Sequence, residues 1–310
     1  MSFATVVWLA VFLAGLGVAL LSTRQTLDSA TSLAHRFGLS PFLIGMTIVA
    51  LGTDLPEIAN SIAASASDHG DLIVGNSIGS TVTQMTLILG IVCFLGVVKA
   101  ERRLVTIAGA VMVVALLLGA FLLSDEFLSR ADGLVLIGTW LVGTIIIQRR
   151  GHLITARQEE IPTTSVWAEV RDLIVGLSGV GLGSVVAVWA FVNFSDELGV
   201  PEYATSFLIL ALGTSLPELF IDGTAIRRGD RALALGDIFG SSFIDSTVAL
   251  GIGPALFPVA VGSEATFGNL IAAGSVAAVV FLLMSRENHR KMSGAVLVVI
   301  YLATYVLVLR

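Results

Sequence analysis

Residues 48–57 read IVALGTDLPE and residues 209–218 read ILALGTSLPE, so the two stretches are identical at eight of ten positions. Each stretch places a glycine and a proline inside an apolar run and ends on a glutamate, Glu57 or Glu218. The offset that takes position 48 to position 209 also relates later landmarks. These are Gly75 and Gly236, Gly79-Ser80 and Gly240-Ser241, and Leu89-Gly90 and Leu250-Gly251. The chain therefore contains an internal repeat.

The composition predicts a polytopic membrane protein. Of the 310 residues 55% are hydrophobic and only 13% charged, whereas a soluble domain carries about 25% charged residues. Apolar runs of roughly 20 residues, enough to cross ~30 Å of hydrocarbon, recur along the chain. The net charge of −6 gives no reason to expect a nucleic-acid partner, and nothing implies a protein partner. The one cysteine, Cys93, excludes an intramolecular disulfide.

Reading these runs between polar breaks predicts an all-α fold of ten transmembrane helices, the first taken as a true span and not a signal peptide. The predicted spans are 4–22, 40–66, 72–97, 104–123, 133–148, 168–193, 203–226, 232–257, 267–284 and 293–309. Residues 1–150 form the first five-helix repeat and 163–310 the second, joined by a cytoplasmic linker, 151–162. The repeated motifs lie within 45–90 and 206–251.

The distribution of Lys and Arg supports the count of ten. The loops that follow odd-numbered helices hold 15 of the 17 basic residues, and the other side keeps only Arg130 and Arg310. Because basic loops stay in the cytoplasm, both termini are expected outside, in a plasma (cell inner) membrane. Five helices per half is an odd number, so the second half is expected upside down relative to the first. Such inverted repeats are typical of transporters.

The prolines predict breaks in the second and seventh helices. The residues concerned are Gly52 and Pro56, and Gly213 and Pro217. Proline removes a backbone donor and clashes with the preceding turn, so the carbonyls near Ala50 and Ala211 are expected to be released. Irregular backbone at membrane depth is tolerated only against protein or a wet cavity. A bound cation is one suitable partner for such carbonyls.

The residues around each break offer oxygen ligands. Glu57 and Glu218 follow the breaks near mid-membrane, where a carboxylate costs at least ~2.5 kcal/mol and is a functional candidate by default. Further side-chain oxygens come from Thr53, Asp54, Thr214 and Ser215, and from the i, i+4 pairs Ser80 and Gln84, and Ser241 and Asp245. These hard ligands suit Ca²⁺ and also Na⁺. No His or Cys lies nearby to recruit a softer metal.

The motif GT-x-LPE followed by G-x-x-x-GS, present in both halves, resembles the sodium/calcium exchangers of the cation/calcium antiporter superfamily in their minimal prokaryotic form. The resemblance implies an ion antiporter and not an enzyme. It implies inorganic cations as partners, the transported ions being Ca²⁺ and Na⁺, within a lipid bilayer and with no cofactor.

The resemblance also implies residue roles. Glu57 and Glu218 would bind Ca²⁺ and Na⁺ alternately. The carbonyls of Thr53 and Thr214 would face Ca²⁺, and Ser215 would help bind Na⁺. The remaining matches are Ser80 and Ser241, which would line flanking Na⁺ sites, and Asp245 at the position where the family has Asn or Asp.

The chain departs from the family pattern at several positions. Asp54 stands where a serine is usual, Gln84 where Asn or Asp is usual, and Asp237 where Asn is usual. Thr81 and Ser242 likewise replace asparagines. An extra acid beside a Na⁺ position raises the cation charge carried, changes the preferred ion or provides a proton-exchanging group. Selectivity and stoichiometry therefore stay open.

Other readings compete with Na⁺/Ca²⁺ exchange. A proton-coupled Ca²⁺ exchanger is the closest rival, and a cation channel is a second. An intramembrane aspartyl protease is weakly suggested by Gly236-Asp237 with Pro254, but the Tyr-Asp pair it needs occurs nowhere. Asp222 either lines a cytoplasmic entrance or pairs with Arg227 or Arg228, and the role of Asp237 is equally open.

Overall fold

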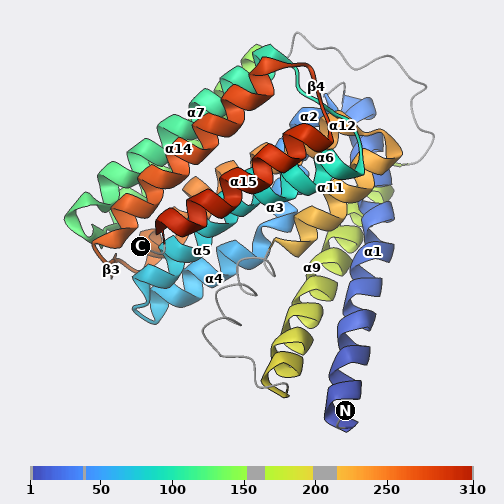
Figure 1. The fold of residues 1–310 in the computed structure, drawn as a ribbon, viewed down its shortest axis with the longest axis horizontal. Helices are drawn as coiled ribbons and strands as arrows, with labels where there is room; N and C mark the ends of the chain where they lie inside the picture. Colours follow the sequence, from blue (N-terminus) through green and yellow to red (C-terminus); the bar gives the residue numbers. More distant parts are fainter. Residues whose placement is uncertain (1–2, 38–39, 152–164, 198–214, 309–310) are drawn as a thin grey trace.

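A computed structural model describes residues 3–37, 40–151, 165–197 and 215–308, and these form a helical bundle (Figure 1). The elements of the first half are α1 (Phe3–Phe37), α2 (Pro41–Ile44), η1 (Gly45–Val49), α3 (Ala50–Thr53), α4 (Leu55–Ala66), α5 (Gly70–Val82), η2 (Thr83–Ile88), α6 (Leu89–Leu95), β1 (Val98–Lys99), α7 (Arg102–Leu122), η3 (Leu123–Asp125), β2 (Phe127–Leu128) and α8 (Arg130–Gly151). Those of the second half are α9 (Val166–Glu197), α11 (Leu216–Arg228), α12 (Arg231–Ile244), η4 (Asp245–Ala249), α13 (Leu250–Leu256), β3 (Val259–Ala260), α14 (Glu264–Ser285), β4 (Asn288–His289) and α15 (Lys291–Val308).

The apolar helices fit a membrane protein. Six helices of the described chain are long and apolar enough to cross a membrane, and a seventh span appears if the bent pair Pro41–Thr53 and Leu55–Ala66 is counted as one. The other predicted spans coincide with α9, α11 and α15, although part of the segment 203–226 lies outside the described residues. The structure therefore confirms a polytopic helical fold, and the count of ten stays a prediction.

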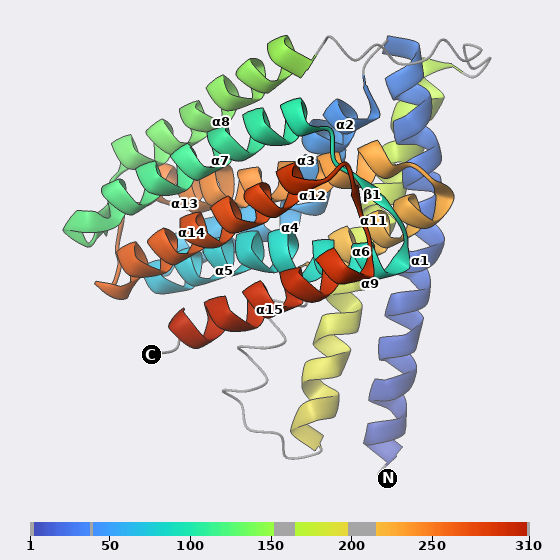
Figure 2. The same cartoon turned by 45° about the horizontal axis from the view of Figure 1, so that its top comes forward.

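The first helix is longer than the sequence predicted. The prediction ended it at residue 22, but α1 continues to Phe37 through a polar stretch. Packing against α9 holds this stretch helical, with Leu27, Ala30 and Leu33 buried in one cluster with Leu173 and Val180. The hydroxyls of Thr23 and Thr26 are satisfied within the helix, because they donate to the carbonyls of Ala19 at 2.9 Å and Ser22 at 3.1 Å. Helix α9 runs beside α1 over much of its length, and the pair packs on α2, α3 and α11 at one end and projects beyond the other helices at the end that holds the N-terminus (Figures 1 and 2).

The break predicted in the second helix is present, and in the second half a described helix begins at the matching position. Helices α3 and α4 meet at Asp54 with a bend of 46°. Asp54 has φ −82° and ψ 4°, and Ser215, its counterpart before α11, has φ −89° and ψ 11°. Pro56 and Pro217 lie in the first turns that follow, where proline removes a donor that the helix does not need. The two halves therefore start a new helix in the same way.

The internal repeat extends to the whole fold. Strand β1 pairs with β4, and β3 pairs with β2, in antiparallel registers that join Val98 to His289 and Val259 to Leu128. These registers are related by the same offset in residue number as the motifs. The packed helix pairs follow the same rule, since α6 lies on α15 as α13 lies on α8, while α1 meets α9 and α7 meets α14. Each half thus packs against the other through equivalent surfaces.

Three short π-helical segments, η1, η2 and η4, interrupt the helices that surround the bundle centre. The first residue of η4 is Asp245, and Gln84 is the second residue of η2. Such segments often occur at functional sites, because the extra residue per turn redirects neighbouring side chains. These segments were not predicted from the sequence, since no residue type marks a π-turn as proline marks a break.

Glycine allows α12 to approach the first half closely. A Cβ atom on Gly236 would lie 2.1 Å from the carbonyl oxygen of Phe42, and one on Gly240 would lie 2.4 Å from that of Met46. The small residues of Gly236-x-x-x-Gly240 thus serve close helix packing in the second half. The positions equivalent to Phe42 and Met46, 203 and 207, lie outside the described residues, so the corresponding prediction for Gly75 and Gly79 stays open.

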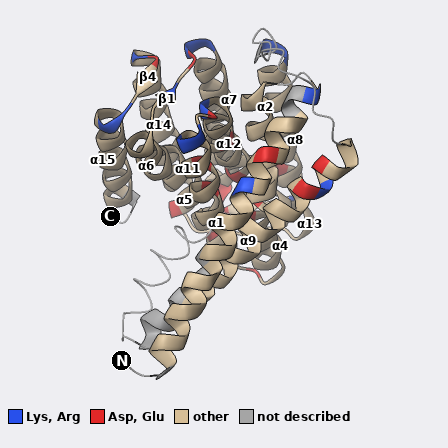
Figure 3. Ribbon diagram, turned by 90° about the vertical axis from the view of Figure 1, so that its right-hand side faces the viewer, with Lys and Arg blue, Asp and Glu red and all other residues tan. Residues whose placement is uncertain are grey.

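Charged residues are separated along the bundle. Lys and Arg gather at the end where α7 begins and α8 ends, and acidic residues run through the middle (Figure 3). None of the buried residues in the described segments is a lysine or arginine. The acidic groups of the interior therefore have no basic side chain buried beside them.

Candidate functional site

Six carboxyl groups of the described chain lie at the centre of the bundle with a relative exposure of 0%. They are Asp54, Glu57, Glu218, Asp222, Asp237 and Asp245. An ionised carboxylate is costly in such a place unless protons, hydrogen-bond donors or cations compensate its charge. Four of the six are predicted site residues that meet at the centre, and the other two form a separate pair.

Asp54 occupies the middle of the central group. It interacts electrostatically with Asp245, Glu218 and Glu57, and its carboxyl group lies within hydrogen-bonding reach of that of Glu218. Although Asp54 is the N-cap residue of α4, its side chain makes no capping bond, and neither of its oxygens accepts a hydrogen bond from a described donor. Two facing carboxyl groups, one of which has no described donor, need a proton or a cation between them.

Hydroxyl groups connect the two halves beside these acids. The Thr53 hydroxyl lies 3.3 Å from that of Ser241 and close to Glu218, and it donates to the Ala50 carbonyl at 3.1 Å. Ser80 and Ser241 are fully buried, and the buried Ser215 hydroxyl has no hydrogen-bond partner among the described residues. The structure therefore places hydroxyl oxygens from both halves around the acidic centre.

Gln84 and Asp245 are equivalent in the repeat and lie next to each other. The Gln84 Oε1 accepts a hydrogen bond of 3.0 Å from the Ser242 hydroxyl. The Gln84 Nε2 and both Asp245 oxygens have no well-formed hydrogen bond within the described part of the chain. The amide therefore accepts from Ser242 through its oxygen and turns its NH₂ group toward the Asp245 carboxylate.

Ala50 differs from the expectation. Its carbonyl was expected to be released by the break, but that oxygen accepts the Asp54 N–H at 3.0 Å and the Thr53 hydroxyl at 3.1 Å. The reason is that Pro56 removes the donor that would bond the carbonyl four residues earlier, Gly52, and leaves the bond from Asp54 intact. A cation bound at Ala50 would compete with both donors.

Two predicted ligands, Thr214 and Ala211, lie outside the described residues. Within the described ranges no three His, Cys, Asp or Glu side chains are grouped closely enough to hold a metal ion by themselves. A cation at the centre would therefore need hydroxyl, amide or carbonyl oxygens besides the carboxylates. The mixed oxygen set around Asp54 and Glu218 has this chemistry.

The structure resolves one alternative for Asp222. The guanidinium of Arg228 pairs at 2.5 Å with Asp28, on α1, and both Asp222 oxygens lack a hydrogen-bond partner among the described residues. Pairing of Asp222 with Arg228 is therefore wrong. Asp222 instead lies next to Asp237 on the neighbouring helix α12.

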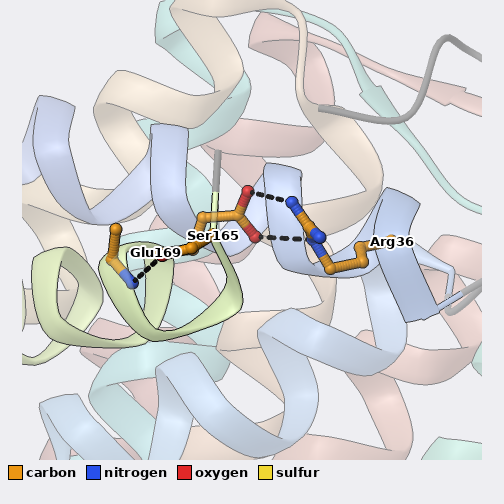
Figure 4. A network of polar contacts seen from close by, with 4 residues as sticks. Arg36, Ser165 and Glu169 are labelled. Carbon is orange, nitrogen blue, oxygen red and sulfur yellow. Dashed lines mark hydrogen bonds and ion pairs between the residues drawn. The ribbon is translucent and has the colours of Figure 1, made fainter. Parts of the chain in front are cut away.

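An ion pair that the sequence does not predict joins the two long helices α1 and α9. Arg36 on α1 contacts Glu169 on α9 through two hydrogen bonds, of 3.2 and 3.0 Å, and Glu169 is only 5% exposed (Figure 4). The two residues lie far apart in the chain, in segments expected to be loop and helix start. No local pattern in the sequence joins them.

The sequence of this chain is similar to those of known cation exchangers and antiporters. The family model described as sodium/calcium exchanger protein matches residues 7–148 and 172–310. The chain is 30% identical to the putative antiporter CaxA of Alkalimonas amylolytica, over 82% of each chain. It is 23% identical to the sodium/calcium exchanger MaX1 of Methanosarcina acetivorans, over 94% of this chain and 96% of that protein.

A solved structure of the sodium-calcium exchanger NCX_Mj, soaked with Na⁺ and Sr²⁺, has the same fold. It superposes with a TM-score of 0.82 at 25% identity and covers 97% of this chain and 99% of its own. The match of the family model extends over both halves, each with its GT-x-LPE motif and its buried glutamate. The chain belongs to the sodium/calcium exchanger family.

Proposed function

We propose that this protein exchanges Ca²⁺ for Na⁺ across the membrane at the acidic centre formed by both halves. The observation that carries the proposal is the meeting of Asp54, Glu57, Glu218 and Asp245 in the bundle, at 0% exposure and with no buried Lys or Arg beside them in the described segments. Four buried carboxyl groups gathered in this way need positive charge. Membership in a family of antiporters makes the transported cations its source.

The ligands follow from the geometry and the repeat. Glu57 and Glu218 supply the shared carboxylates, with Asp54 and Asp245 beside them. Oxygen ligands are completed by Thr53, Ser80, Gln84, Ser215 and Ser241, together with the predicted Ala50, Ala211 and Thr214. Because Ca²⁺ requires six to eight oxygens, loading with Ca²⁺ occupies the groups that Na⁺ needs. The two ions therefore exclude each other.

The topology supports alternating access. We infer ten spans arranged as two inverted repeats, 1–150 and 163–310, around the linker 151–162, with termini outside and basic loops in the cytoplasm of a plasma membrane. The support is the constant offset in residue number between paired elements and the gathering of basic residues at one end (Figure 3). Rocking or sliding of one part against the other would expose the centre to each side in turn.

A proton-coupled Ca²⁺ exchanger is the second candidate, and Asp54 favours it. Its carboxyl group faces Glu218, and its own oxygens accept no hydrogen bond from a described donor. A carboxyl group placed in this way exchanges a proton when a cation leaves. The name of the relative CaxA, a putative antiporter, does not state the coupling ion.

The test is ion flux in proteoliposomes with Na⁺, K⁺, H⁺, Ca²⁺ and Mg²⁺ gradients varied one at a time. Ca²⁺ uptake driven by an outward Na⁺ gradient, and insensitive to a pH gradient, supports Na⁺/Ca²⁺ exchange. Uptake that follows the pH gradient and ignores Na⁺ supports the second candidate. The variants Glu57→Gln and Glu218→Gln keep side-chain size and are expected to reduce uptake to background, whereas intact uptake in both would overturn the site.

A further inference from the structure

Asp222 and Asp237 form a second pair of buried carboxyl groups outside the central group. Asp222 lies one turn after Glu218 on α11, about 6 Å along the helix at about 1.5 Å per residue. Asp237 lies on α12, which packs against α11, and the two carboxyl groups are within hydrogen-bonding reach of each other. Both residues have a relative exposure of 0%.

Nothing described around the pair neutralises it. All four oxygens of Asp222 and Asp237 are buried and accept no hydrogen bond from a described donor. Arg228, at the end of α11, is engaged with Asp28. Glu218 adds a further negative charge nearby. Two carboxylates in such surroundings are stable only with bound positive charge.

The fold itself does not need acids at these positions. The repeat offset makes Ser61 the counterpart of Asp222, and Asn76 the counterpart of Asp237. Ser61 is part of the packing, because its hydroxyl accepts the Gly253 N–H at 3.2 Å. The same helix crossing is therefore built with neutral side chains in the first half. The acidic pair is a property of the second half alone.

We propose that Asp222 and Asp237 form a second cation site for a hard divalent ion such as Ca²⁺, between the central site and the basic loop at Arg227–Arg231. The inference deepens the proposed function and rests on it. Two facing carboxylates balance the charge of one divalent ion, and the remaining oxygens would come from carbonyls and water. Ca²⁺ would thus have an additional binding site between the central site and one side of the membrane, with no equivalent site in the first half.

Equilibrium binding of ⁴⁵Ca²⁺ to the purified full chain in Na⁺-free buffer tests the site. The central site is disabled by Glu57→Gln with Glu218→Gln, and Asp222→Asn with Asp237→Asn is then added to it. The first variant is expected to retain Ca²⁺ binding, and the fourfold variant to lose it. In the same background Asn76→Ala, at the neutral counterpart position, is expected to keep the residual binding.

Three results would overturn the second site. One is loss of all Ca²⁺ binding in the Glu57→Gln, Glu218→Gln variant, and another is unchanged binding in the fourfold variant. The third is an infrared band of a protonated carboxyl group that disappears with Asp222→Asn and Asp237→Asn and does not respond to Ca²⁺, since the pair would then hold a proton. The single variant Asp237→Asn, checked for monodispersity and thermal unfolding, repeats the test with less change to the interior.

Failure of the proposed function has a different signature. If the proposed function is wrong, the unmodified protein shows no Na⁺-driven Ca²⁺ uptake in the flux assay, or the Glu57→Gln, Glu218→Gln variant retains that uptake, whatever the ⁴⁵Ca²⁺ experiment gives. If only the second site is wrong, that variant loses flux, and Asp222→Asn with Asp237→Asn leaves the ⁴⁵Ca²⁺ binding curve of the otherwise unmodified protein unchanged.

Discussion

The hydroxyl of Thr81 lies 3.3 Å from the carbonyl oxygen of Ser242, the residue that occupies the equivalent position in the second half. Two equivalent positions touch only near the axis that relates the halves, so this contact places the axis where α5 crosses α12. The next equivalent pair, Gln84 and Asp245, also meets there, but with different chemistry on each side. Both halves thus form the centre, but they contribute different side chains at equivalent positions.

This inequality is greatest at Asp54, whose counterpart is Ser215. Asp54→Ser makes the two halves alike and removes one charge from the centre. Two unit charges ~4 Å apart interact by about 4 kcal/mol at an effective dielectric constant of ~20. Because a tenfold change in affinity corresponds to ~1.4 kcal/mol, we expect the apparent Ca²⁺ affinity to fall by about tenfold or more. Flux measured over a series of Ca²⁺ concentrations gives this value.

The control for Asp54→Ser is Asp68→Asn. Asp68 is an exposed acid at the turn between α4 and α5, with φ of 61°, a conformation that asparagine accepts. Asp68→Asn removes the same charge far from the centre, and the Ca²⁺ dependence of its flux is expected to match that of the unmodified protein. An unchanged affinity in Asp54→Ser would contradict the central position of Asp54.

The ion pair between Arg36 and Glu169 is expected to stabilise the contact of α1 with α9. Arg36→Leu leaves a carboxylate of 5% exposure without its guanidinium. Breaking a buried pair costs up to ~3–5 kcal/mol, whereas replacing both partners by apolar residues is often close to neutral. We expect Arg36→Leu to lower the unfolding temperature, and Arg36→Leu combined with Glu169→Leu to restore much of it. Thermal unfolding in detergent compares the two, and a double variant less stable than the single one would contradict this account.

The two breaks and the acidic residues after them could be predicted from the sequence, because proline and intramembrane carboxylates act locally. The repeat offset also identified which residues of the two halves are equivalent. The predicted end of the first helix was wrong, since packing of α1 against α9 keeps a polar stretch helical. The pairing of Arg36 with Glu169 was missed because it depends on tertiary packing. The prediction that the Ala50 carbonyl is released was wrong, because the hydrogen bond that Pro56 removes is the one to the Gly52 carbonyl.

Gly240 is expected to be intolerant of any larger side chain. Its Cβ would lie 2.4 Å from the carbonyl oxygen of Met46, and backbone cannot move aside as a flexible side chain can. We expect Gly240→Val to abolish the monodisperse species in size-exclusion chromatography. Gly268 on α14, where an added Cβ would meet no described atom within 4 Å, is the matched control. Gly268→Ala is expected to keep the unfolding temperature or to raise it, because alanine favours a helix over glycine by up to ~1 kcal/mol.

The orientation of the chain can be tested with a thiol reagent that does not cross membranes. The native Cys93 is buried, so the unmodified protein is expected to react slowly and to give a low background. Arg103 and Ser124 are exposed near opposite ends of α7, a helix of 21 residues that is long enough to span the membrane. In intact cells Ser124→Cys is expected to react and Arg103→Cys to react only after the cells are opened. The reverse pattern would place the basic loops outside and invert the proposed topology, including the side on which Asp222 and Asp237 lie.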